Sequence, residues 1–377
     1  MIYLDHAATT PVPRAVADTI YTVLTEHFGN PSAQYPMGLE TKKQVELWRR
    51  TVAKALGCES RQLFFTSCGT EGDNWAIQAA CWQNRRLGRH IVTTAVEHSA
   101  MLEGCRWMEQ QGWEVTYLAP DGEGVITAQQ VLDAVRPDTA LVSCMLVNNE
   151  LGTVYPIQDI ARGLAGKNSQ TLLHTDAVQG FLKIPFSAKT LGADFITISA
   201  HKIGGPKGIG ALYIGPRVKN PRPLLPGGGQ EGGLRSGTEA TAQIAGFAKA
   251  VELRTEGLEG KLRHMAEIKA YAKEQLSAIP DLVFVGRSDA PHILSVSLVG
   301  WPSQNIVNDL GSQGICISAG SACHQGKPSQ VVAALHLPKK TAGSVVRLSF
   351  GPETTREDID ACVQALRRHH DTRMPML

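Results

Sequence analysis

The chain has 377 residues, of which 43% are hydrophobic and 19% charged, which is ordinary for a soluble globular protein of about two domains. Its 37 Lys and Arg residues nearly balance its 35 Asp and Glu residues, and the net charge of +2 gives no electrostatic reason to expect nucleic acid as a ligand. No apolar run approaches the ~18 residues of a membrane span, so we expect no membrane partner.

Eight cysteines occur at irregular spacings and without a C-x-x-C pair, which argues against a zinc site and against a small disulfide scaffold. We therefore expect no metal site, reduced thiols and a cytoplasmic location. The opening stretch MIYLDHAATT lacks a basic region followed by an apolar one, so it does not resemble a signal peptide.

Short apolar runs alternate with helical patterns from about residue 63 to residue 214. The runs predicted as strands are LFFTS (63–67), HIVTTA (90–95), EVTYLA (114–119), ALVSCMLV (140–147), TLLHTDAV (171–178), DFITISA (194–200) and ALYIG (211–215). Helical patterns such as Thr127–Val135 and Ile157–Leu164 lie between several of them. This alternation predicts an α/β domain with a mostly parallel, seven-stranded sheet flanked by helices, and the near-continuous apolar runs suit strands buried on both faces.

The pattern changes after the glycine-rich stretch PGGGQEGGLRSGTEATA (226–242). A long helical stretch follows at Thr241–Ala278, and then come further strands and a closing amphipathic helix at 355–370. The later strands are LVFVG (282–286), HILSVSLVG (292–300) and SVVRLSFG (344–351). We predict a large domain of residues 16–255 and a smaller α+β domain of residues 1–15 and 256–377.

Polar residues gather where the predicted strands end, and such strand ends are where α/β sheets hold ligands. The stretch TSCGTEGDN after the first strand opens a helix whose N-terminus could hold a phosphate with Thr70, although ordinary N-capping explains the same residues. The polar residues that follow later strands are Glu97, His98, Asn148, Asn149, Asp176, Gln179, Ser199, His201 and Lys202. Each alone could make a turn, a cap or a solvated loop. Four such groups at the ends of one sheet favour a ligand site.

Pyridoxal phosphate is the cofactor whose chemistry joins these groups. It needs a lysine for a Schiff base, a carboxylate on its pyridinium nitrogen, and hydroxyl or backbone donors for its phosphate. Two further residues are candidates for the reaction. Cys323 lies among Gly, Ser and Ala in CISAGSACHQGKPS, and Arg347 lies in an apolar strand, where a substrate carboxylate or a structural ion pair would partner it.

The motifs YLDHAATT, FGNPSA, TEGDN, NNELG, HTDAVQ, SAHKIGGPKGIGALY, GGGQEGGLRSGT and SAGSAC occur in the order found in cysteine desulfurases of the NifS/IscS-like group. The resemblance covers nearly the whole chain. It implies a fold-type I, pyridoxal phosphate-dependent enzyme of the class V aminotransferase family, usually a homodimer. Such an enzyme converts L-cysteine to L-alanine and passes sulfur from an enzyme persulfide to an acceptor protein.

The resemblance also implies roles for individual residues. Lys202 resembles the Schiff-base lysine, His98 the residue stacked on the ring and available for proton transfer, and Cys323 the sulfur-accepting nucleophile. The implied cofactor contacts are Asp176 to the pyridinium nitrogen, Gln179 to the ring oxygen, Thr70, Ser199 and His201 to the phosphate, and Thr238 to the phosphate of the partner subunit. Asn149 and Arg347 resemble the site for the substrate carboxylate.

The chain departs from the family pattern at Cys68, Gly232 and Tyr35, where Gly, Arg and His are common, and the stretch after Cys323 is shorter than usual. None of these changes removes a predicted catalytic group. The sulfur acceptor stays open between iron–sulfur cluster assembly, tRNA thiolation and DNA phosphorothioation. The alternatives are selenocysteine lyase, another pyridoxal phosphate enzyme of the same fold, or a non-catalytic scaffold.

Overall fold

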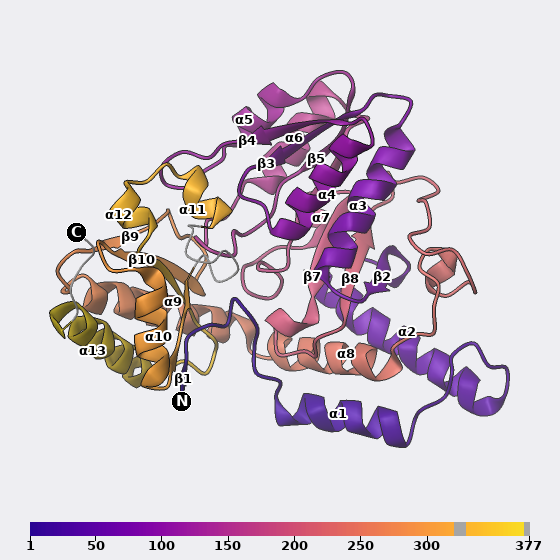
Figure 1. The fold of residues 1–377 in the computed structure, drawn as a ribbon. Helices are drawn as coiled ribbons and strands as arrows, with labels where there is room; N and C mark the ends of the chain where they lie inside the picture. The colour runs from indigo at the N-terminus through magenta and orange to yellow at the C-terminus, as the bar shows by residue number, and fades with distance from the viewer. Residues whose placement is uncertain (320–328, 373–377) are drawn as a thin grey trace.

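The computed structural model describes residues 1–319 and 329–372. Its larger part is built on a seven-stranded sheet (Figure 1). Its spatial order is β2 (Leu63–Thr66), β8 (Gly210–Ile214), β7 (Phe195–Ser199), β6 (Leu172–Asp176), β5 (Thr139–Ser143), β3 (His90–Thr94) and β4 (Glu114–Leu118). Strands β7, β6, β5, β3 and β4 pair in parallel, whereas β8 is antiparallel to both of its neighbours. The predicted mostly parallel sheet is confirmed.

The reversal at β8 has a local cause. Parallel strands need a crossover of a dozen or more residues, and the connection 200–209 between β7 and β8 is shorter than that. The chain therefore turns back at the end of β7 through the short 3₁₀ helix η2 (Ala200–Lys202). This turn places Lys202 at the carboxyl edge of the sheet.

Helices cover both faces of this sheet, as the apolar strands predict. Successive strand residues point to opposite faces, so Ile91 packs in one buried cluster with α3 and α4, and Val92 packs in another with α2, α6 and α8. The helices of this part are α1 (Arg14–Thr25), α2 (Pro36–Leu56), α3 (Gly69–Asn84), α4 (Ser99–Gln110), α5 (Ala128–Ala134), α6 (Ile157–Lys167), α7 (Ala188–Leu191) and α8 (Thr241–Thr255).

Two expectations about elements are corrected. The predicted strand 140–147 ends at Ser143, and the single predicted helix 241–278 is two helices, α8 and α9 (Leu258–Leu276). The break falls at Gly257, whose φ of 61° is left-handed and cannot continue a right-handed helix. The sequence pattern also assigned no element to residues 14–56, where α1 and α2 lie.

The smaller part has a four-stranded antiparallel sheet in the order β12 (Ser318–Ala319), β13 (Val345–Ser349), β10 (Ile293–Leu298) and β9 (Leu282–Phe284). Its other elements are β1 (Ile2–Tyr3), β11 (Ile315–Cys316), α9, α10 (Ser303–Ser312), α11 (Gln330–Ala334), α12 (Lys339–Ala342) and α13 (Arg356–Thr372). A buried cluster of its own contains Leu4 and residues from 268 to 366. The domain boundaries given above stay a prediction.

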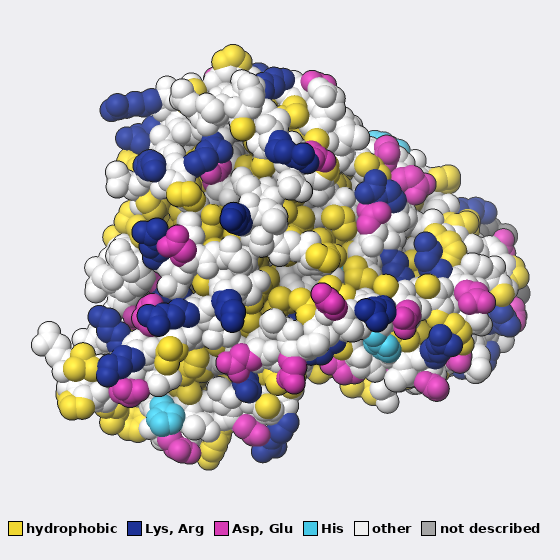
Figure 2. All heavy atoms as spheres, turned by 180° about the vertical axis from the view of Figure 1, so that it is seen from behind, with side chains coloured by type: hydrophobic (Ala, Val, Ile, Leu, Met, Phe, Trp, Pro, Cys, Tyr) yellow, Lys and Arg dark blue, Asp and Glu magenta, His cyan; other side chains and the backbone are white. Residues whose placement is uncertain are grey.

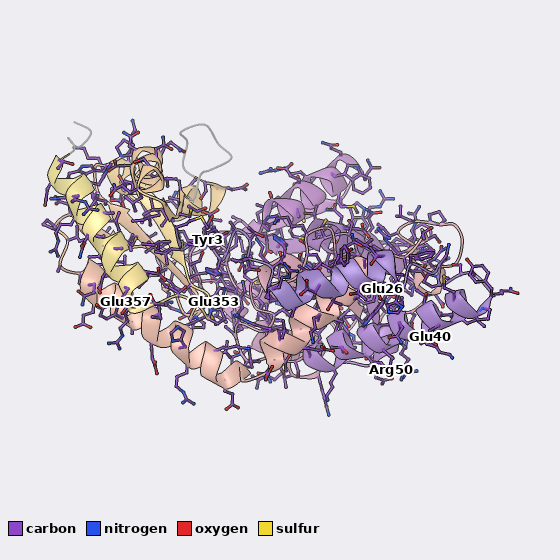
Figure 3. All side chains as sticks on the ribbon, turned by 90° about the horizontal axis from the view of Figure 1, so that it is seen from below. Tyr3, Glu26, Glu40, Arg50, Glu353 and Glu357 are labelled. Carbon is purple, nitrogen blue, oxygen red and sulfur yellow. The ribbon has the colours of Figure 1, made fainter. Side chains whose placement is uncertain are left out.

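The first residues of the chain connect the two parts. Strand β1 pairs in parallel with β11, and the indigo segment that follows it runs to α1 beneath the large sheet (Figure 1). Tyr3 lies at the junction in the view from below (Figure 3), and its hydroxyl donates to the carbonyl of Thr9 at 2.8 Å. The backbone of Asp5 bridges Ser349 at the end of β13, and the backbone N–H of Thr10 donates to the carbonyl of His201 after β7 at 3.0 Å, so the segment contacts both larger parts of the fold.

The surface seen from behind carries Lys/Arg and Asp/Glu side chains interspersed with one another, in keeping with the small net charge (Figure 2). Within residues 1–319 and 329–372, no helix is both long and apolar enough to cross a membrane.

Candidate active site

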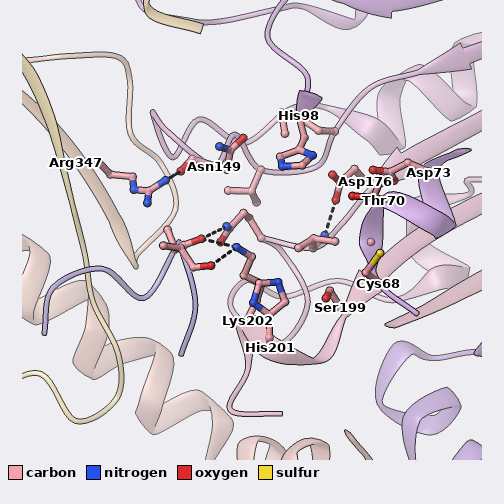
Figure 4. A pocket seen from close by; sticks show the side chains of 17 residues that line it. Cys68, Thr70, Asp73, His98, Asn149, Asp176, Ser199, His201, Lys202 and Arg347 are labelled. Carbon is pink, nitrogen blue, oxygen red and sulfur yellow. Dashed lines mark hydrogen bonds between the residues drawn. The ribbon is translucent and has the colours of Figure 1, made fainter. Parts of the chain in front are cut away.

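A cavity of about 280 Å³ lies at the carboxyl ends of the large-sheet strands (Figure 4). Most of the residues predicted for the site line it, namely Thr70, His98, Asn149, Asp176, Gln179, Ser199, His201, Lys202 and Arg347. The small domain contributes Arg347 from β13, and the N-terminal segment contributes Ala7 and Ala8. Residues separated by more than two hundred positions therefore meet in one cavity.

Two predicted residues do not appear among the lining. Thr238 is exposed in the glycine-rich connection, so in a single chain it does not reach this cavity. Cys323 lies outside the described residues. No group of three or more His, Cys, Asp or Glu side chains suited to a metal ion occurs in the part of the chain that the structure describes.

Lys202 presents its amine to the cavity from the turn after β7. Its Nζ donates to the carbonyl oxygens of Ala7 and Ala8, both at 2.7 Å. Burial and then the nearby Arg347 cation lower the pKa of Lys202 from 10.5 to about 8. An amine with that pKa is far more often uncharged near neutral pH than an exposed lysine, as a nucleophile for a carbonyl group must be.

Buried carboxylates lie on the far side of the cavity from Arg347 (Figure 4). Asp176 ends β6, and its Oδ1 accepts from the backbone N–H of Val178 at 2.8 Å. Burial and the neighbouring carboxylate of Asp73 raise the pKa of Asp176. Burial likewise raises the pKa of Asp73 to about 7. The Oδ1 of Asp73 accepts no hydrogen bond, and His174 Nε2 lies 3.5 Å from it. A cationic ring nitrogen placed here would favour the charged form of these buried carboxyls and would offer them a hydrogen-bond donor.

His98 caps the N-terminus of α4 and lies at the upper side of the cavity in Figure 4. Its Nδ1 accepts from the backbone N–H of Ala100 at 3.2 Å. In the neutral imidazole the proton therefore sits on Nε2, because Nδ1 is used as an acceptor. The hydrogen bond to Nδ1 fixes the ring, and the Nε2–H can donate to another group.

The N-terminus of α3 and two side chains make an anion-binding end of the cavity. Thr70 stands in the first turn of this 16-residue helix, where free backbone N–H groups and the helix dipole favour an anion. The buried hydroxyl of Ser199 has no hydrogen-bond partner. His201 Nδ1 lies 3.2 Å from Thr9 Oγ1, and burial lowers the pKa of His201 to about 4, so its ring is neutral.

The opposite end of the cavity suits a carboxylate. Arg347 Nη1 donates to the carbonyl of Asn149 at 2.7 Å, and Nη2 pairs with Asp5 Oδ1 at 2.7 Å. The Nε of Arg347 and the Oδ1 of Asn149 are buried and have no partner. A buried guanidinium with an unused donor fits an incoming anionic group.

Gln179 is held by protein contacts on both sides of its amide. Its Nε2 donates to the carbonyl of Ala7 at 2.8 Å, and its Oε1 accepts from Lys183 Nζ at 3.0 Å. Lys183 is buried, and burial with the Lys202 cation lowers the pKa of Lys183 well below its usual value. The Ala7 carbonyl thus links Gln179 to Lys202.

The sequence reasoning missed Asp73, Lys183 and Asp5. Asp73 could have been found, because it follows Thr70 by three positions and so lies on the same helix face. Asp5 carried no such signal, since its contact with Arg347 depends on the packing of distant segments. Lys183 contacts Gln179 four positions earlier, and what the sequence did not indicate is that its amine is buried.

These residues fit pyridoxal phosphate. The cavity offers an amine of lowered pKa, a buried carboxylate, an anion-binding helix N-terminus and an unpaired buried hydroxyl, which are the groups that this cofactor requires. The Arg347 end of the same cavity suits the carboxylate of an amino acid.

The chain is similar over nearly its whole length to proteins of known family. Residues 2–362 match the aminotransferase class-V family. The cysteine desulfurase IscS of Clostridium botulinum (strain Hall) is 39% identical over 374 residues, which cover 97% of this chain and 93% of that protein.

Two solved structures agree with that likeness. A NifS-like protein has a TM-score of 0.92 and 34% identity, covering 98% of this chain and 99% of that one. The structure of SspA in complex with cysteine has a TM-score of 0.82 and 32% identity, covering 94% of this chain and 100% of that one.

Proposed function

The chain belongs to the aminotransferase class-V family, and we propose that it is a pyridoxal phosphate-dependent cysteine desulfurase. In this reaction L-cysteine becomes L-alanine and its sulfur stays on Cys323 as a persulfide. The observation that carries the proposal is the cavity in which the Lys202 amine faces a buried carboxylate on one side and the Arg347–Asn149 end on the other. The desulfurase relative and the cysteine complex of SspA support the choice of substrate.

The cofactor would be held mainly by residues that line this cavity. Lys202 would bond it covalently, His98 would stack on its ring, and Asp176 and Gln179 would hold its ring nitrogen and ring oxygen. Its phosphate would lie against Thr70, Ser199 and His201, with Thr238 reaching the phosphate held in the partner subunit of a homodimer. When bound, pyridoxal phosphate supplies a cationic ring that withdraws electrons from the substrate's α-carbon.

The chain's own residues would carry out the rest. Arg347 and Asn149 orient the substrate by its carboxylate. The Lys202 amine would remove the proton from the α-carbon, and His98 would be available for proton transfer.

The Cys323 thiolate then attacks the substrate sulfur, as a thiolate attacks a disulfide. The sulfur–carbon bond breaks while a sulfur–sulfur bond forms. The β-carbon keeps the electron pair of the broken bond and takes up a proton. The proton removed from the α-carbon is returned there, so alanine leaves with its α-hydrogen restored. Cys323 retains the –S–SH group, and no external oxidant is required.

The persulfide would pass to an acceptor protein of iron–sulfur cluster assembly, tRNA thiolation or DNA phosphorothioation. A reducing, cytoplasmic location is part of the proposal. It is supported by the cysteines of the described residues, all of which are free thiols.

The test is paired detection of alanine and sulfide from L-cysteine and a reductant. We expect equal amounts of both products from the wild type and none from Cys323→Ala or Lys202→Ala. Full turnover by Cys323→Ala would overturn the persulfide mechanism. A yellow protein that makes neither product from cysteine but releases alanine from selenocysteine would indicate a selenocysteine lyase. A colourless protein would indicate a non-catalytic scaffold.

A further inference from the structure

Asp5 joins three separate segments behind the carboxylate-binding end of the cavity. Its Oδ1 pairs with Arg347 Nη2 at 2.7 Å, and its Oδ2 accepts from Ser318 Oγ at 3.0 Å. Ser318 lies directly opposite Arg347 in the β12–β13 pairing, and the backbone of Asp5 bridges Ser349 at the end of β13. The carboxylate is therefore fixed at both oxygens by the sheet that carries Arg347.

This arrangement determines how Arg347 faces the cavity. A guanidinium is planar, so two hydrogen bonds in different directions fix the plane of the group. Nη2 is held by Asp5 and Nη1 by the carbonyl of Asn149, which leaves the buried Nε without a partner. Without Asp5, the guanidinium would keep only the Asn149 contact and could rotate about it.

We propose that Asp5 is a positioning residue of this site: it fixes the plane of Arg347 for the substrate carboxylate and offsets the Arg347 charge beside Lys202. The inference rests on the function proposed above, since it assumes that Arg347 receives an amino-acid carboxylate. Asp5 itself contacts Arg347 and does not line the cavity.

The charge effect has a definite sign. The charged and titratable groups around the Lys202 amine are Arg347, Lys183, His201, Asp176 and Asp5. Arg347 lowers the pKa of Lys202, whereas Asp176 and Asp5 raise it. Removing the Asp5 charge therefore disfavours any protonated form of the Lys202 nitrogen, and it also leaves the Arg347 cation without its partner.

Two substitutions separate orientation from charge. Asp5→Ala removes both, whereas Asp5→Asn removes the charge and keeps an oxygen acceptor for Arg347. Asp18→Asn is the matched control, because it makes the same change in net charge at an exposed ion pair with Arg14 on α1. On the holoenzymes we would measure kcat and KM for alanine formation from L-cysteine, together with the pH at which the absorbance of the bound cofactor changes.

We expect Asp5→Ala to raise KM about tenfold or more with little change in kcat, the effect of losing a hydrogen bond to a charged group. Asp5→Asn should keep KM near the wild-type value. In both variants the absorbance change should move to lower pH, and Asp18→Asn should match the wild type in both measurements.

The inference is overturned if Asp5→Ala leaves KM and the absorbance titration unchanged, or if it lowers only kcat and the melting temperature. Should Asp5→Ala fail to fold, the near-isosteric Asp5→Asn decides through the titration. That titration needs only bound cofactor, so it still tests the charge effect if the wild type makes no alanine from cysteine. In that case it is the proposed function that has failed.

Discussion

At the scale of the residue, the cavity works by changing the protonation of ordinary side chains. Burial holds the Lys202 amine at a pKa of about 8 and the Asp73 carboxyl at about 7. It also holds the ring of His201 neutral by lowering its pKa to about 4. None of these shifts follows from residue type, because each depends on how far the folded chain removes the group from water.

The shift at Lys202 predicts the pH dependence of cofactor binding to the apoprotein. Only the uncharged amine attacks the aldehyde of pyridoxal phosphate, and its fraction rises about tenfold per pH unit until the pH reaches the pKa. The rate of reconstitution, followed by absorbance, should therefore rise with pH and level off near pH 8. Arg347→Gln removes a nearby cation and should move the plateau to higher pH. A rate that still rises tenfold per unit well above pH 9 would contradict the lowered pKa.

At the scale of the element, the main difference from the sequence pattern is the division of the helical stretch 241–278. Helices lie on either side of Gly257 and no proline stands between them, so the sequence pattern was interpreted as one helix. Gly257 ends the pattern because it alone can adopt a φ of 61° without strain. The break at Gly257 then lets α8 pack in the buried cluster of the large sheet, against α1 and α2, and α9 in the buried cluster of the small sheet.

Two glycines three residues apart test this explanation. Both Gly257 and Gly260 are exposed, and a Cβ at either would meet nothing within 4 Å. Gly257→Ala should destabilise the protein by about 1–2 kcal/mol, because an alanine at that φ is strained. Gly260→Ala, inside α9, should stabilise it by up to about 1 kcal/mol through helix propensity. Unfolding in urea measures both, and equal effects of the two substitutions would show that φ at residue 257 is unimportant.

At the scale of the whole molecule, the N-terminal segment holds the site together. Leu4 is fully buried in the small-domain cluster, Asp5 pairs with Arg347, and the carbonyls of Ala7 and Ala8 accept from Lys202. Residues 4–8 thus connect the core of the small domain, the carboxylate-binding end of the cavity and Lys202 of the large domain. A substitution that disrupts the small-domain core near Leu4 should therefore also displace the residues of this segment that contact Arg347 and Lys202.

Leu4→Ala is the corresponding prediction. It should lower the free energy of unfolding by about 2–5 kcal/mol, the usual cost of an emptied core position. Val12→Ala, at a more exposed position of the same segment, is the control and should cost far less. Urea unfolding at fixed cofactor concentration checks both. Equal, small effects would mean that residue 4 does not contribute to the core.

The sequence by itself determined the α/β class, the mostly parallel sheet, and the strand ends where Lys202, Asp176 and His98 stand. These are consequences of local pattern, because strand alternation and short connections place such residues at one edge of a sheet. The motif order also pointed to the family to which the chain belongs.

Only the tertiary structure brought Asp5 to Arg347 and Asp73 beside Asp176. These pairs join segments that no local pattern relates. Their effect on protonation also depends on burial, which exists only once the two domains have packed around the cavity.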